Sequence, residues 1–365
     1  MSKAAELAAL IGSQTALSNR NLVINGAMQV AQRGTSSTGF VATADYLTVD
    51  RFKLENGSSG TFTVSQATDA PAGFANSLKF DCTTADASPD YFLIVHRLEG
   101  QNVQHLEKGT STSKKTTLSF HVKSNKTGTY QVNFRDVDNS RLIGRTYTIS
   151  AANTWEKKTV TFDGDTSGTL GNDNGNSMQL EWWLASGSTY NSGAVPTAWE
   201  AIADGDRAAG LNVAIGASTD DEFYITGIQL EVGEQATPFE HRSFGDELQR
   251  CMRYYEKSYP YSIAPSTAVS YPSIIAITVR GMDEETSGQR YITNTMRVEK
   301  RTNPTNTFYD DAGNAGKVTT FDNAGTATNN VSVGLVVTGT NMIGCGPGNS
   351  AIWGFGFFYE SDAEL

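Results

Sequence analysis

The sequence of 365 residues contains few of the residues on which disulfide-bonded and nucleic-acid-binding proteins depend. Its three cysteines, Cys82, Cys251 and Cys345, are far apart, and no C-x-x-C pair occurs, so neither a disulfide framework nor a zinc site is expected. We expect three buried apolar residues or free thiols. Lys and Arg number 28 against 39 Asp and Glu, and the net charge of −11 argues against nucleic acid as a partner.

Membrane and catalytic signatures are also missing. No stretch approaches the roughly 18 apolar residues of a membrane helix, and no basic segment followed by an apolar run opens the sequence. We therefore expect no membrane insertion, no signal peptide, and synthesis in a cytoplasm. The histidines, at 96, 105, 121 and 241, lie in no H-E-x-x-H motif, and neither G-x-S-x-G nor a phosphate loop occurs. The sequence predicts no enzyme.

The abundant residues are those of short strands and tight turns. Gly numbers 35, and charged residues make up only 18% of the chain. From Asn21 to Leu230, strand-like runs such as KTTLSFHVKS are separated by turn clusters such as KSNKTG. No helical pattern of 10–15 residues alternates with these runs, which disfavours a parallel α/β sheet. We predict an all-β jelly roll, two antiparallel sheets packed face to face, over residues 21–240.

Two short helices are predicted beside this sandwich. Residues 1–20 carry an apolar helical stripe of Leu7, Leu10, Ile11 and Leu17. A helix this short is marginal alone, so the stripe packs on its own sandwich, on symmetry mates or on another protein; we assign it to attachment or oligomerisation. Residues 241–257 form a linker helix in which Ser243 is the cap, with carboxylates in the first turn.

The chain after this linker changes in composition. Residues 258–365 contain further strand-like runs with Gly- and Asn-rich loops, and we predict a smaller C-terminal β-domain. Its last strand carries Trp353, Phe355 and Phe357 on one face. This face is too apolar to leave in water, so it is either core or subunit interface. We assign it to a C-terminal interface.

Short segments near both ends bracket the predicted sandwich. Residues 21–36 read NLVINGAMQVAQRGTS, followed by VDRF at 49–52. Residues 225–233 read ITGIQLEVG, and ATPFEHRS at 236–243 and RCMRYYEKS at 250–258 come next. The segments from 225 to 258 resemble a junction common in phage tail-fibre and related virion proteins, and those at 21–36 and 49–52 resemble a second element of the same family. The order of strands also resembles the carbohydrate-binding β-sandwich modules found beside glycoside hydrolases.

The resemblance implies a phage virion structural protein made in the host cytoplasm. It implies a homotrimeric tail fibre or receptor-binding protein that attaches to other tail proteins through its N-terminus and contacts host cell-surface polysaccharide. Two alternatives use the same modules: a head decoration or fibre-linking protein, and a carbohydrate-active enzyme or binding module. An enzyme would need two acids converging in a cleft, and the sequence offers no such pair.

Aromatic residues are the candidates for glycan contact. Trp182 and Trp183 are adjacent in QLEWWLAS, so on a strand they face opposite sides. One joins the core, while the other either stacks on a sugar ring or is covered by the long loop or a neighbouring subunit. Tyr190 and Trp199 flank the segment beyond and share this assignment. Trp155 opens the candidate strand TWEKKTVTF, earlier in the chain, and is expected to pack.

Carboxylates cluster in the loop DGDTSGTLGNDNGN, which contains Asp163, Asp165 and Asp173. Acids in a Gly- and Asn-rich loop are usually solvated turn formers. The alternative is Ca²⁺, which takes oxygen ligands from irregular loops, and the resembling modules often hold a structural calcium ion. No other cofactor is expected.

Overall fold

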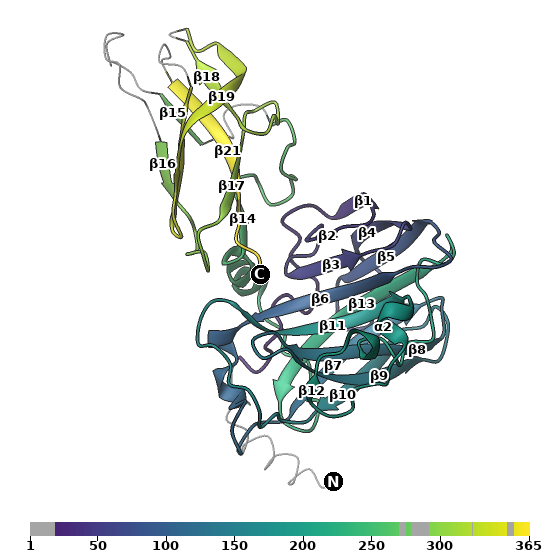
Figure 1. Ribbon diagram of the computed structural model, residues 1–365. Helices are drawn as coiled ribbons and strands as arrows, with labels where there is room; N and C mark the ends of the chain where they lie inside the picture. The colour runs from purple at the N-terminus through teal and green to yellow at the C-terminus, as the bar shows by residue number, and fades with distance from the viewer. Residues whose placement is uncertain (1–18, 270–274, 279–291, 323, 349–353) are drawn as a thin grey trace. The chain divides into compact units, whose positions relative to one another are not determined.

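The computed structural model of the chain describes residues 19–269, 275–278, 292–322, 324–348 and 354–365 (Figure 1). The chain forms two compact units. The first contains Thr35–Glu247 with the residues up to Ala31 and Leu365, and the second contains Gln32–Gly34 and Leu248–Glu364. The predicted division at 21–240, 241–257 and 258–365 stays a prediction. The predicted N-terminal helix, with Leu7, Leu10, Ile11 and Leu17, lies outside the described residues.

The first unit is a sandwich of two antiparallel sheets, which confirms the predicted all-β jelly roll. Sheet A has the order β1 (Ser36–Phe40), β4 (Thr61–Ala67), β5 (Ser77–Thr84), β13 (Glu222–Val232), β7 (Thr116–Ser124) and β10 (Glu156–Phe162). Sheet B has the order β12 (Glu200–Ala201), β9 (Arg141–Ile149), β8 (Gly128–Asp136), β11 (Asn176–Ser186), β6 (Tyr91–Glu99), β3 (Phe52–Asn56) and β2 (Ala44–Asp45). Short helical turns lie in its connections: η1 (Gly100–Asn102), η2 (Gln104–Leu106), α2 (Ser188–Asn191) and η3 (Asp204–Asp206).

Period-2 alternation places the core between the sheets. In β7, Leu118, Phe120 and Val122 face inward and are fully buried, while the residues between them face outward. From sheet B, Trp182 packs edge-to-face on Phe120 with ring centroids 6.0 Å apart. Each such side chain stabilises the fold by about 1.5–3 kcal/mol relative to exposure.

The segment before the first strand is held against β13. The pairing of β13 with β7 shifts register between Thr226 and Gln229, and Gly227 within this bulge has φ +61°. A bulge leaves backbone groups without ladder partners. The N–H of Ile228 donates instead to the carbonyl of Gly26 at 2.9 Å. A Cβ on Gly26 would lie 2.1 Å from the Ile228 oxygen, so only glycine fits there.

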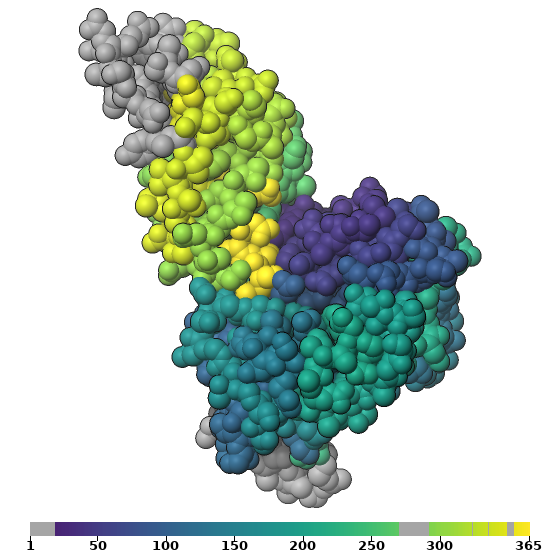
Figure 2. All heavy atoms as spheres, viewed as in Figure 1, coloured from purple at the N-terminus to yellow at the C-terminus, as the bar shows by residue number. Residues whose placement is uncertain are grey.

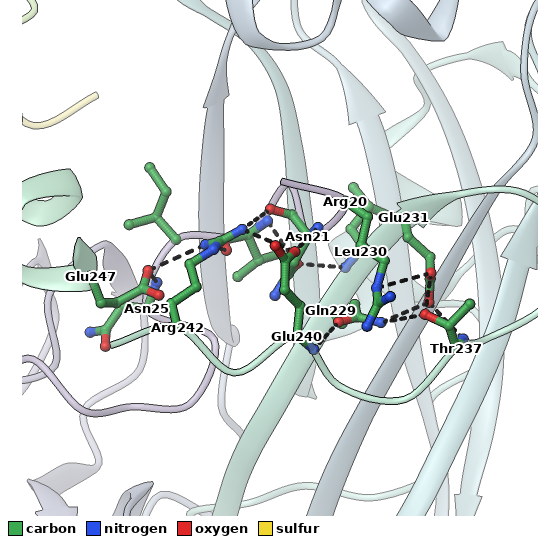
Figure 3. A network of polar contacts seen from close by, with 12 residues as sticks. Arg20, Asn21, Asn25, Gln229, Leu230, Glu231, Thr237, Glu240, Arg242 and Glu247 are labelled. Carbon is green, nitrogen blue, oxygen red and sulfur yellow. Dashed lines mark hydrogen bonds and ion pairs between the residues drawn. The ribbon is translucent and has the colours of Figure 1, made fainter. Parts of the chain in front are cut away.

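The side chain of Asn21 completes this attachment (Figure 3). Its amide nitrogen donates to the Ile228 carbonyl at 3.0 Å, and its oxygen accepts from the Leu230 N–H at 3.1 Å. Leu22 adds a backbone bond to Leu230 at 2.9 Å. The side chain of Asn21 thus makes the hydrogen bonds to the bulged backbone that a neighbouring strand would otherwise make.

Residues after β13 also bind the segment that precedes the first strand. Glu240 accepts the backbone N–H of Asn21 at 2.7 Å, and Glu247 accepts that of Asn25 at 2.5 Å. Arg242 donates to the carbonyls of Asn21 and Val23 and is paired with both carboxylates at 3.5 Å. We call residues 20–26 with 226–247 the clasp. It joins two of the segments that carry the resemblance to virion proteins.

The second unit is also antiparallel β. Its sheet has the order β14 (Tyr255–Lys257), β21 (Gly354–Asp362), β18 (Lys317–Phe321), β19 (Ala327–Thr338), β20 (Met342–Pro347) and β16 (Ile292–Thr295), while β15 (Ile275–Thr278) and β17 (Thr305–Tyr309) also pair with β21. Phe355 and Phe357 of β21 lie in its core with Phe308, Val318 and Cys345, at 1% and 0% exposure. This corrects their assignment to a subunit interface, because one chain already buries both rings. Trp353 lies outside the described residues.

Helix α3 spans Phe244–Met252. The backbone N–H of Asp246 donates to the Ser243 hydroxyl at 3.2 Å, which confirms Ser243 as the cap. The side chains of Cys82, Cys251 and Cys345 are all buried, as expected. Over the part of the chain that the structure describes, no helix combines the length and apolarity needed to cross a bilayer.

Candidate functional site

The two adjacent tryptophans face opposite sides of sheet B, as the sequence predicts, but neither is exposed. Trp182 lies in the sandwich core and Trp183 lies on the other face, and both are 0% exposed. The ring of Trp183 packs on Tyr190, with centroids 5.2 Å apart, and under the guanidinium of Arg207. The outer ring is therefore covered, which was one of the two alternatives. This corrects the assignment of Trp182 and Trp183 to glycan contact, because no sugar reaches either ring in this structure.

The segment 187–215 covers Trp183 because it satisfies the polar side chains of the same face. Arg207 pairs with the fully buried Glu181 at 3.2 Å. Gln131 donates to the Asp206 and Arg207 carbonyls at 3.0 and 2.9 Å, and it accepts from the Gly210 N–H at 2.7 Å. In Figure 2 the teal-green atoms of this part of the chain cover the face where Figure 1 shows β11 and β8.

Tyr190 and Trp199 are both half-buried. Besides Trp183, Tyr190 contacts the ring of Tyr91 edge-to-face at 5.5 Å. The Trp199 indole N–H donates to the Asp163 carbonyl at 2.6 Å, and its ring lies 5.8 Å from that of Phe134. Both serve in packing, and their role in glycan contact stays a prediction.

The three aspartates proposed for calcium do not converge. Asp163 is paired with Arg145 at 3.2 Å, and Asp165 with Arg141 at 2.7 Å and Lys108 at 3.0 Å. The Asp173 carboxylate accepts from the Gly175 N–H at 2.8 Å. Among the residues that the structure describes, no group of three or more His, Cys, Asp or Glu could hold a metal ion. The residues present therefore do not fit a calcium site formed by these three carboxylates.

The outward face of sheet A carries a cluster that the sequence did not single out. Tyr224 of β13 lies between Lys79 of β5 and Lys123 of β7 in the strand register. Asp81 and Glu222 are paired in the next row. Trp155, which precedes β10, and Asp69, which follows β4, approach from the loops. We call these seven residues the Trp155 surface: Asp69, Lys79, Asp81, Lys123, Trp155, Glu222 and Tyr224.

Aromatic rings and charges alternate across this surface. The Trp155 indole donates to Asp69 at 2.9 Å, and Asp69 also pairs with Lys123. The Lys123 ammonium lies 4.1 Å from the centre of the Tyr224 ring and 5.6 Å from that of Trp155. These contacts hold the Trp155 ring in place from two sides.

The carboxylates of the surface have different proton affinities. Hydrogen bonds from Lys123 and Trp155 lower the pKa of Asp69. Burial and then the hydrogen bond to Glu222 raise the pKa of Asp81. Burial would raise the pKa of Glu222, but Lys79, which lies 2.7 Å away, and the Tyr224 hydroxyl, which donates to it at 2.9 Å, lower that pKa on balance. At neutral pH the surface therefore offers carboxylate acceptors beside ammonium donors.

This chemistry suits a polyhydroxyl ligand. Each sugar hydroxyl both donates and accepts a hydrogen bond, and the C–H face of a pyranose stacks on an aromatic ring. The side chains of Asp69, Asp81 and Glu222 are 49%, 40% and 33% exposed, so their oxygens are accessible. The sequence could have predicted part of this surface from the alternation of FYIT in β13. Phe223 and Ile225 face the core, which places Tyr224 on the outward face.

No protein-family model and no curated protein matches the sequence of this chain. Bacteriophage CBA120 tailspike protein 4 is similar in structure, with 10% identity over 59% of this chain and 22% of that one and a TM-score of 0.31. A putative sugar binding protein from Bacteroides thetaiotaomicron is 12% identical over 58% of this chain and 100% of that one, with a TM-score of 0.35. A family 11 carbohydrate-binding module from Clostridium thermocellum is 13% identical over 56% and 99%, with a TM-score of 0.29.

These similarities are low. Every one of these TM-scores is below 0.5, and the chain spans about a fifth of the tailspike protein, 22% of its length. The function proposed below therefore rests on this chain's own residues.

Proposed function

We propose that this protein is a non-catalytic, glycan-binding structural protein of a phage virion, and that the Trp155 surface contacts the glycan. The observation that carries the proposal is the part-exposed Trp155 ring held beside accessible carboxylates and ammonium groups on one sheet face. An aromatic plane with donors and acceptors around it is what a sugar ring needs. Tyr190 and Trp199 form the alternative contact set.

The virion role is that of a homotrimeric tail fibre or receptor-binding protein that attaches to other tail proteins through residues 1–20. The clasp supports this proposal, because it joins two segments that resemble virion junctions, around Asn21 and Arg242. The ligand is host cell-surface polysaccharide. A single stacked ring contributes only about 0.5–1.5 kcal/mol, so useful adhesion requires several linked copies acting together.

The test is binding of the full-length protein to an array of bacterial surface polysaccharides. We compare the unmodified chain with Trp155→Ala, Trp155→Phe and Tyr190→Ala. Loss of the ring in Trp155→Ala should weaken binding per site about 3- to 10-fold. Trp155→Phe keeps a ring and should retain most of the affinity, while Tyr190→Ala should bind normally.

Two results would contradict the proposal in different ways. If the unmodified chain binds no polysaccharide on the array, glycan binding is wrong. If it binds but Trp155→Ala binds equally well and Tyr190→Ala does not, the glycan lies on the segment that covers sheet B. Unchanged thermal unfolding of each variant serves as the folding control.

A further inference from the structure

The side chain of a buried lysine reaches into the loop for which calcium was the alternative prediction. The side chain of Lys108, two residues after η2, is only 3% exposed. Its ammonium contacts the Asp136 carboxylate, Asp165 Oδ2 at 3.0 Å, and the carbonyl oxygens of Ser167 and Gly168 at 2.7 and 3.0 Å. The two carboxylates are 0% and 4% exposed. Burying a charged amine is costly unless it is fully paired, and here oxygens on several sides pair it.

The donor set is that of a cation site for a hard metal ion. Two carboxylates and two backbone carbonyls from a strand end and an irregular loop are oxygen ligands of the kind that Ca²⁺ takes. Charge is also balanced: Arg141 donates to both oxygens of Asp165, at 2.7 and 3.2 Å, so two cations face two carboxylates. A metal ion added to this arrangement would have to displace the lysine.

The loop closes tightly around the lysine. The Gly109 N–H donates to the Asp165 carbonyl at 2.8 Å. A Cβ on Gly109, which has φ +82°, would lie 2.9 Å from the Gly168 carbonyl carbon. Asn139 donates to both oxygens of Asp136, through its backbone N–H at 3.0 Å and its side-chain amide at 2.9 Å. The oxygens are thus fixed in position by contacts that do not involve Lys108.

We propose that the Lys108 ammonium takes the place of a structural metal ion, so that residues 163–168 are ordered without calcium and removal of the lysine creates a calcium site. The loop therefore needs no metal supply for folding, unlike a calcium-bound equivalent. This inference does not depend on glycan binding, because it concerns a different part of the sandwich from the Trp155 surface.

The experiment compares the full-length protein with Lys108→Ala in calcium chloride and in EDTA. The unmodified protein should unfold at the same temperature in both buffers. Lys108→Ala should unfold at a lower temperature in EDTA, with a saturable rise of about 5–10 °C in calcium at a hundred times its Kd. The double variant Lys108→Ala with Asp136→Asn lacks one ligand charge and should lose most of this rise.

Terbium provides a second readout at the same position. The Lys108 ammonium lies 5.3 Å from the centre of the Trp199 ring. A Tb³⁺ ion bound in Lys108→Ala should therefore luminesce when tryptophan is excited, and calcium should compete the signal away. The unmodified protein should give no such signal.

Three results would overturn the proposal. The first is a folded Lys108→Ala protein that responds neither to calcium nor to terbium. The second is an unmodified protein that EDTA destabilises. If Lys108→Ala does not fold in EDTA, the variant is refolded from denaturant in calcium. Recovery of the fold in calcium alone supports the proposal. Failure to fold in both buffers is the third result that would overturn it.

Discussion

At the scale of single residues, His96 shows how burial sets a charge state. It lies in β6, fully buried, with its ring 5.1 Å from that of Phe52 and its Nε2 3.3 Å from the Ile24 N–H. Its Nδ1 has no hydrogen-bond partner among the described residues. Burial, and then the nearby charge of Arg51, lowers the pKa of His96 to about 3. The folded protein therefore keeps this ring neutral under mildly acidic conditions.

This predicts a loss of stability in acid that begins near neutral pH. The unfolded chain takes up a proton at His96 below about pH 6.5, whereas the folded chain does so only near the lowered pKa of about 3. The contribution of His96 to the free energy of unfolding is thus fully present above pH 6.5 and decreases as the pH drops. At pH 5 it has fallen by about 2 kcal/mol. Between pH 7.5 and pH 5, the free energy of unfolding of His96→Gln, measured with urea, should decrease by about 2 kcal/mol less than that of the unmodified chain. His241→Gln, at an exposed position, is the control and should behave like the unmodified chain.

Sequence patterns predicted the direction of side chains but not what covers them. The alternation of β11 correctly placed Trp182 and Trp183 on opposite faces, because direction depends only on strand geometry. Whether the outer ring is covered depends on residues 187–215, in which α2 has only four residues and the rest has no periodic pattern. For the same reason Trp155 was expected only to pack. Its partners Asp69 and Lys123 are far from it in sequence, at separations that no local pattern encodes.

At the scale of elements, the clasp requires particular residue types in the two segments that it joins. Asn21, Gly26 and Gly227 are each required by the geometry of one bulge: an amide that pairs with strand backbone, a residue without Cβ, and a residue at φ +61°. The strands themselves were predicted because alternating residues are a local signal. The register shift at Thr226–Gln229 was not, because ITGIQLEVG read simply as one strand.

Gly26→Ala tests the clasp. The new Cβ would lie 2.1 Å from the Ile228 oxygen, so the backbone must move and the Ile228 hydrogen bond is lost. We expect a loss of about 3 kcal/mol in the free energy of unfolding, measured by urea denaturation. The matched control is Gly245→Ala in α3, where no atom lies within 4 Å of the added Cβ. It should be neutral or stabilising by up to about 1 kcal/mol. Equal effects of the two substitutions would show that the clasp is not tightly packed.

At the scale of the whole molecule, the proposed trimer has a direct test. Phe355 and Phe357 are buried within one chain, so they do not require contact with another subunit. The other predicted source of assembly is the segment 1–20. Light scattering should give a mass three times 39.3 kDa for the full chain. A chain lacking residues 1–20 should be a monomer if the apolar stripe holds the subunits together. A monomeric full chain would contradict the trimeric fibre and favour a head decoration protein or a single binding module.

The clasp also has a mechanical consequence. The chain enters the sandwich near Asn21 and leaves it near Arg242. There the side chains of Glu240, Arg242 and Glu247 hydrogen-bond to the backbone of the entering segment. Tension applied along the chain at these two points passes through these few bonds and β13 rather than across the two sheets. The two sheets then carry little of the force, so the Trp155 surface should keep its shape while the chain is under tension.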